Sequence, residues 1–100
     1  MGNIEFKNRN NLNENYAQLA YAIVIQAIRD YEDALCRLHK RPKSHSALKM
    51  LKDCEDFFLN EISYYFDYDG KMIMQKVQKI VEENGYVKSN GKIIIGELLE

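Results

Sequence analysis

The stretch LAYAIVIQAI at residues 19–28 decides the fold, because every residue in it except Gln26 is apolar. A membrane-spanning helix needs about 20 consecutive apolar residues, roughly twice this length, so the stretch predicts a buried helix segment instead. Apolar side chains would point almost all the way round such a helix. We therefore expect this apolar belt to be covered on more than one side, either by two packed elements or by a second subunit.

Apolar residues continue outward from the apolar belt at spacings of three and four, which keeps them on one face of a helix. They predict a helix up to about Leu38, with Asn11 or Asn13 as the cap at its start, since a short side-chain oxygen accepts hydrogen bonds from the first turn. Residues 1–11 are polar and rich in Asn. They are predicted to form a flexible N-terminal arm.

A second helix is predicted after the basic turn around Pro42, because proline cannot continue a helix. Ser44 or Ser46 is expected to cap it, and its apolar residues recur at spacings of three and four as far as Phe66. The connection between the first and second helices is short. The two helices are therefore expected to form an antiparallel hairpin.

The last third of the chain predicts a shorter helix and then a change of structure. A turn at residues 68–70 precedes a third helix that ends at Asn84-Gly85. Asn90-Gly91 then separates two short apolar runs, the pattern of a tight β-hairpin over residues 86–95. The predicted fold is mainly α: an antiparallel helical hairpin, a short third helix and a C-terminal β-hairpin, together one domain over residues 12–100.

The composition limits the classes of function. One hundred residues make one small domain that needs neither disulfides nor metal to fold. The 14 Lys and Arg against 15 Asp and Glu give a net charge of -1, which argues against coating nucleic acid or an acidic membrane through bulk charge. Two Cys and the lack of a signal-peptide pattern indicate unpaired thiols in a reducing compartment, so a cytoplasmic location is predicted.

Four side chains that can bind zinc lie around the turn between the first two helices: Cys36, His39, His45 and Cys54. Their order is Cys-x2-His followed by His-x8-Cys, which is not typical of structural zinc sites, where close pairs hold the ion from both sides. No metal site is predicted. Cys54 is interpreted as a core thiol that behaves as a small apolar residue.

Asp67-Tyr-Asp-Gly70 has the opening of a calcium loop, but positions six and twelve would be Met72 and Gln78 instead of Gly and Glu. We favour a turn in which an Asp caps the third helix and Gly70 has an unusual dihedral angle. The motifs of serine hydrolases, phosphate-binding loops and zinc proteases do not occur in the sequence. We predict no catalytic residue, no cofactor and no enzymatic activity.

Charge is segregated along the chain although the total is near zero. Residues 37–43 carry four positive charges and no acid, residues 53–69 carry six acids and no base, and residues 71–92 carry five Lys against two Glu. Tyrosines cluster in the acidic stretch, and protein interfaces are enriched in aromatic side chains. The residues predicted to bind a partner protein, called the acidic tyrosine segment, are Glu61, Tyr64, Tyr65, Asp67, Tyr68 and Asp69.

Two other functions stay open. A lysine-bearing helix followed by a hairpin is what a winged-helix DNA reader presents, and the residues that would contact DNA are Lys71, Lys76, Lys79, Lys88 and Lys92. Residues 71–92 contain no Arg, the residue that most often reads bases. A structural or assembly protein is the third interpretation, with the apolar belt as the interface of a homodimer.

Several short motifs between residues 20 and 75 resemble a group of small helical proteins encoded by phages and prophages of Firmicutes. The residues that carry the resemblance are Ala22-Ile-Val24, Ala27, Asp30-Tyr31, Ala34-Leu35, Leu38, Ala47, Glu55, Phe57-Phe58, Asp69-Gly70 and Ile73. The resemblance implies a mobile-element setting in a bacterial host cell, where such proteins bind host or phage proteins, including nucleases of host defence systems such as CRISPR. The leading prediction is therefore a non-catalytic protein-binding protein that inhibits such a nuclease, with a DNA-binding transcriptional regulator as the alternative.

Overall fold

The computed structural model describes the backbone of residues 2–99 and the side chains of residues 16–97. The elements follow in the order α1 (Gly2–Lys40), α2 (His45–Asp56), a π-helical turn η1 (Phe57–Glu61), a 3-10 turn η2 (Ile62–Tyr64), α3 (Gly70–Glu83) and α4 (Lys92–Leu99). The described backbone is mainly helical and contains no strand.

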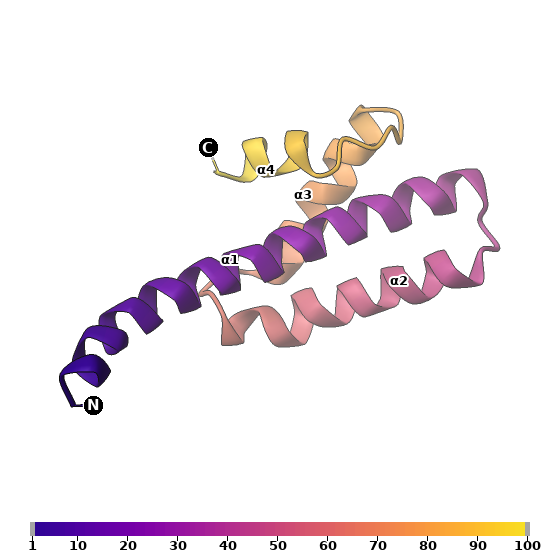
Figure 1. The fold of residues 1–100 in the computed structure, drawn as a ribbon. Helices are drawn as coiled ribbons and strands as arrows, with labels where there is room; N and C mark the ends of the chain where they lie inside the picture. Colours follow the sequence, from indigo (N-terminus) through magenta and orange to yellow (C-terminus); the bar gives the residue numbers. More distant parts are fainter. Residues whose placement is uncertain (1, 100) are drawn as a thin grey trace.

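The first two helices form the predicted antiparallel hairpin, with α2 lying alongside the C-terminal half of α1 (Figure 1). Pro42 lies in the turn between them, and Ser44 caps α2 because its Oγ accepts a hydrogen bond from the Ala47 N–H at 3.3 Å. Of the two predicted caps, the structure therefore selects Ser44. The N-terminal half of α1 extends past the end of α2, which gives the molecule its long axis of 55 Å (Figure 1).

The predicted start of the first helix is wrong, because α1 begins at Gly2 and not at Asn11 or Asn13. Residues 2–11 of the predicted arm thus form the first turns of α1, while Met1 and the side chains of residues 1–15 lie outside the described part. Asn costs a helix only about 0.7 kcal/mol per residue relative to Ala, which a helix nucleated elsewhere can bear. The flexibility of this segment stays a prediction.

The apolar belt is covered on one side and open on another. Ala20, Val24 and Ile28 are buried at a spacing of four, whereas Leu19 is 61% exposed and Tyr21 is 43% exposed. The packing of α1 against α2, α3 and α4 accounts for the covered side. No helix in the described part of the chain is long and apolar enough to span a membrane.

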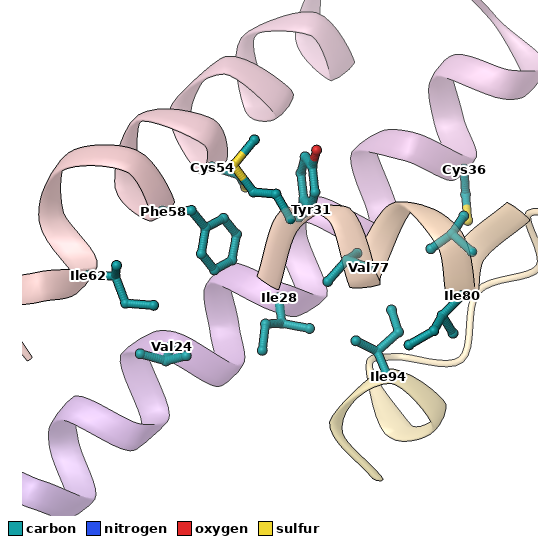
Figure 2. Close-up of a cluster of buried hydrophobic side chains, with 12 residues drawn as sticks. Val24, Ile28, Tyr31, Cys36, Cys54, Phe58, Ile62, Val77, Ile80 and Ile94 are labelled. Carbon is teal, nitrogen blue, oxygen red and sulfur yellow. The ribbon is translucent and has the colours of Figure 1, made fainter. Parts of the chain in front are cut away.

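The core lies where all four helices converge, and Figure 2 shows its side chains pointing at one another from α1, α2, α3 and α4. Tyr31 and Phe58 are its largest fully buried members, with ring centroids 5.8 Å apart. The remaining members are Val24, Ile28, Cys36, Cys54, Ile62, Met74, Val77, Ile80, Val81 and Ile94. Gln78 donates a hydrogen bond of 2.6 Å to the Tyr31 hydroxyl, which gives this buried polar group a partner.

The π-helical turn η1 continues α2 and adds Phe58 to the core. The Ile62 N–H donates to the Phe57 carbonyl five residues earlier, one residue more than in an α-helix. Cys54, Phe58 and Ile62 are all buried, so a spacing of four is kept on the core side through this turn. The wide turn brings the Phe58 carbonyl against the start of α3, where Gly70 leaves room for it.

Both ends of α3 have the predicted caps. The Asp69 carboxylate accepts hydrogen bonds from the N–H groups of Lys71 at 3.0 Å and Met72 at 3.4 Å. At the other end, Gly85 has φ +68°. The Gly85 N–H donates a hydrogen bond to the Glu82 carbonyl and the Tyr86 N–H donates one to the Val81 carbonyl, which together form a Schellman motif. The unusual dihedral angle predicted for Gly70 is wrong, since among the described glycines only Gly85 and Gly91 have positive φ.

The predicted β-hairpin over residues 86–95 is wrong, because residues 92–99 form helix α4. Asn90 and Gly91 do adopt positive φ angles of 57° and 78°, as a tight hairpin turn requires. The chain then turns into a helix that buries Ile94 completely and leaves Ile93 45% exposed. A run of four residues such as 92–95 fits a strand or a helix equally well, and here contacts with α1 and α3 select the helix.

Candidate protein-binding surface

The acidic tyrosine segment lies on η1, η2 and the loop that leads to α3, so the structure keeps its six residues together. Tyr64 is 75% exposed and Tyr68 is 53% exposed, and the carboxylates of Glu61 and Asp67 are exposed beside them. The Tyr16 hydroxyl donates a hydrogen bond of 3.2 Å to the Tyr64 carbonyl, which ties the segment to α1. Its phenol and carboxylate groups therefore face solvent from a backbone that is held in place.

Two of the six predicted residues have structural tasks. Tyr65 is half-buried and stacks on Phe57, with ring centroids 6.0 Å apart. Asp69 caps α3, so its carboxylate is already accepting two backbone hydrogen bonds. The residues that remain for a partner are Glu61, Tyr64, Asp67 and Tyr68.

The acids of residues 53–69 are not neutralised by the described cations. Both ion pairs among the described side chains involve Asp33, which contacts Arg37 at 3.2 Å and also Lys88. Glu61 and Asp67 take part in neither of these pairs. The open end of the helical hairpin, opposite the turn at Pro42, therefore has a negative electrostatic potential next to exposed aromatic side chains.

An apolar groove of about 220 Å³ adjoins the acidic tyrosine segment. It lies between α1, the loop before α3, α3 itself and α4, and Tyr68 belongs to both the groove and the segment. Tyr68 stacks on Phe66 at 5.1 Å, which fixes the wall that they form. The side chains that line it include Tyr21, Ile25, Phe66, Tyr68, Met72 and Lys76. The groove has the volume of one or two apolar side chains of a partner.

Sequence reasoning missed this groove because its walls come from four separate segments. Tyr21 and Met72, 43% and 53% exposed, are the signal that was present, since both are large apolar side chains exposed on their helices. Tyr21 and Met72 lie far apart in the sequence, so only the packing of α3 across α1 reveals that they line the same groove.

The five lysines of the DNA-binding alternative are not gathered into one positive surface. Lys71, Lys76 and Lys79 are exposed along α3. Lys88 is engaged in an ion pair with Asp33, and Lys92 lines a cavity that also contains Asp30, Glu32 and Asp33. The hairpin over residues 86–95 that would have served as the wing does not form, because residues 92–99 are helix α4. The geometry therefore offers this alternative less support than the sequence did.

The cysteines and histidines considered for zinc are dispersed by the fold. Within the described residues no three His, Cys, Asp or Glu side chains are grouped to hold a metal ion. His39 stacks flat on Tyr86 with ring centroids 3.9 Å apart, whereas Cys36 and Cys54 are buried. Burial raises the pKa of Cys54 to about 12, and the carboxylate of Asp30 adds to this effect. Burial likewise raises the pKa of Cys36.

Both thiols are expected to resist labelling by a disulfide reagent in the native protein at pH 8. A thiol with a pKa of about 12 has about a thousandfold less thiolate than one with the ordinary value, and only the thiolate reacts. The measurement compares the labelling rate of native and denatured protein. Rapid labelling of Cys54 under native conditions would show that this part of the core opens easily.

Comparison of the chain with protein-family models, curated proteins and solved structures finds no match in any of the three.

Proposed function

We propose that this chain is a non-catalytic protein-binding protein that docks through the acidic tyrosine segment and the adjoining apolar groove. The observation that carries the proposal is the placement of Tyr64 and Tyr68, both more than half exposed, at the open end of the helical hairpin. The carboxylates of Glu61 and Asp67 beside them take part in neither ion pair among the described side chains. Exposed aromatic side chains contribute large contact areas at low entropic cost, which is why they dominate the energy of many interfaces.

The charge of this surface indicates the chemistry of the partner. Glu61 and Asp67 favour a basic surface, because opposite potentials speed encounter and exclude acidic partners. The groove beside Tyr68 adds a place for an apolar side chain of that partner. A nuclease of a host defence system, which holds nucleic acid in a positive groove, has a surface of this kind. Such a nuclease is the partner that the resemblance to phage proteins implies. The acidic tyrosine segment would inhibit it by occupying the positive groove in which the nuclease holds nucleic acid.

The test begins with recovery of a partner and ends with variants of the surface. Tagged protein is used to recover proteins from a Firmicute lysate, with and without nuclease treatment, and the partner is then purified for titration calorimetry. We expect Tyr64→Ala with Tyr68→Ala, and separately Glu61→Gln with Asp67→Asn, to weaken binding at least about tenfold, since side chains at the centre of an interface contribute about 2 kcal/mol or more each.

A charge-matched control is available on α3. Glu82 and Glu83 are exposed acids outside the acidic tyrosine segment, so Glu82→Gln with Glu83→Gln changes the net charge by the same amount as the carboxylate variant. We expect this control to bind as tightly as the unchanged protein. Equal losses in the control and in the carboxylate variant would attribute binding to net charge alone, and full binding by the tyrosine variant would contradict the proposed surface.

A further inference from the structure

The turn of the helical hairpin carries a second charged surface, of the opposite sign. Residues 37–52 contain six Lys and Arg, two His and no acid. This surface, called the basic tip, consists of the exposed side chains of Arg37, Lys40, Arg41, Lys43, Lys49 and Lys52. Arg37 is paired with Asp33, while the other five take part in neither ion pair among the described side chains. The basic tip lies at the end of the hairpin opposite the acidic tyrosine segment (Figure 1).

The basic tip encloses a cleft suited to an oxyanion. The last turn of α1 and the first turn of α2 line a space of about 360 Å³ with Arg37, Lys40, Arg41, Ser44 and Ser46. The two serine Oγ atoms lie 3.3 Å apart, and the turn is held by the hydrogen bond from the Ser44 N–H to the Arg41 carbonyl at 3.1 Å. Guanidinium, ammonium and hydroxyl groups that line one cleft can donate to the several acceptor oxygens of a phosphate group.

We propose that the basic tip binds the phosphodiester backbone of double-stranded nucleic acid. Five cations within 13 residues, none of them in an ion pair among the described side chains, are enough to contact several phosphates at once, and such contacts supply most sequence-independent affinity. The small net charge of the whole chain does not oppose this, because residues 37–52 contain no acid and the acidic tyrosine segment lies at the other end of the hairpin (Figure 1). The same polarity orients the molecule, since phosphates attract the basic tip and repel the acidic end.

Two features favour duplex nucleic acid over other polyanions. Residues 37–52 contain no Phe, Tyr or Trp, whereas proteins that bind single strands stack bases on such side chains. Leu48, 44% exposed, is the one large apolar side chain exposed in this range, whereas a helix that lies on a membrane inserts a broad apolar face. Backbone contact with a duplex needs neither bases on aromatic rings nor apolar insertion.

The test measures the affinity of the full chain for a fluorescein-labelled duplex of mixed sequence by anisotropy, over a series of KCl concentrations. The variant Lys40→Gln, Arg41→Gln, Lys43→Gln removes three charges from the basic tip, and Lys71→Gln, Lys76→Gln, Lys79→Gln removes three from α3. We expect the tip variant to bind at least about tenfold more weakly, with the slope of log K against log salt reduced by about 2.7. The α3 variant should stay within about twofold of the unchanged protein.

A second tip variant keeps the outcome interpretable. Lys49 and Lys52 are exposed on α2, away from the turn, so Lys49→Gln with Lys52→Gln leaves the hairpin connection intact and should also reduce both the affinity and the slope. No duplex binding at low salt would overturn the proposal. So would equal losses in the tip and α3 variants, tighter binding of a single strand, or tip-dependent binding of phosphatidylserine vesicles without binding of the duplex. None of these results depends on a protein partner, so they leave the proposed function to its own test.

Discussion

Replacing Gly70 with Ala is expected to destabilise the protein by about 3 kcal/mol or more. A Cβ at this position would lie 1.6 Å from the Phe58 carbonyl oxygen and 2.5 Å from its carbonyl carbon, distances at which atoms overlap. Both neighbours are backbone atoms in the π-helical turn, so no side-chain rotation can relieve the contact. Either α3 moves away from η1 or the turn is remodelled, and overpacking of this kind costs about 1–3 kcal/mol even where the neighbours can yield.

Gly96 provides the matched control, because a Cβ added there meets nothing within 4 Å. It lies inside α4, where Ala is a better helix former than Gly by about 1 kcal/mol, so Gly96→Ala should leave stability unchanged or raise it. Urea unfolding followed by circular dichroism gives the free energy of unfolding for both variants. A Gly70→Ala protein as stable as the unchanged chain would show that α3 does not pack this closely on η1 in solution.

The role of Gly70 shows where local sequence reasoning stops. The turn at residues 68–70 and the Asp cap of α3 were predicted from short-range chemistry, and both are present. The reason for glycine was not predictable, because Gly70 meets a carbonyl that lies twelve residues earlier on a turn of irregular pitch. Periodicity recovered the presence of α1, α2 and α3 for the same short-range reason, since each depends on residues three and four apart.

The predicted C-terminal β-hairpin was wrong for a long-range reason of the same kind. Asn90 and Gly91 have the positive φ angles of a tight turn, so the Asn-Gly pair does mark a turn, although no hairpin follows it. Helix α1 determines the direction of the chain after this turn. The carboxylate of Glu32, 59 residues before Gly91, accepts a hydrogen bond from the Gly91 N–H. With that group engaged and Ile94 buried in the shared core, the chain continues as α4. No local pattern around residue 90 contains this information.

The candidate surface was predictable in composition but not in geometry. Clustering of acids and tyrosines between residues 53 and 69 is visible in the sequence. Which of these side chains face solvent depends on the π-helical turn and on the tasks of Tyr65 and Asp69, and these are determined only by the fold. The groove beside Tyr68 depends on four segments that lie far from one another in the sequence.

Replacing Glu32 with Ala is expected to cost about 3 kcal/mol and to release the C-terminal segment. Glu32 is 2% exposed, and its carboxylate accepts hydrogen bonds from the Ser89 hydroxyl at 2.7 Å, the Ser89 N–H at 3.3 Å and the Gly91 N–H at 2.9 Å. Truncation leaves these donors without their acceptor in a site that Ala cannot fill. A buried donor without a partner costs about 1–3 kcal/mol, and hydrogen bonds to a charged group lie at the upper end.

Two further variants distinguish the loss of the hydrogen bonds to Glu32 from the loss of a negative charge. Ser89→Ala removes only the hydroxyl and should cost about 1 kcal/mol, because both backbone N–H groups keep their acceptor. Glu97→Ala removes an exposed acid from α4 and should change stability by less than about 0.5 kcal/mol. The expected order of stability is therefore Glu97→Ala above Ser89→Ala above Glu32→Ala.

Hydrogen exchange gives a local readout that global unfolding does not. If Glu32 holds the turn before α4, its truncation should speed amide exchange in residues 89–97 more than in α2, because α4 loses the contact that places it on α1. Uniform acceleration along the chain would mean that Glu32 acts only through global stability. Unchanged exchange in residues 89–97 would mean that burial of Ile94 alone is sufficient to hold α4 on the core.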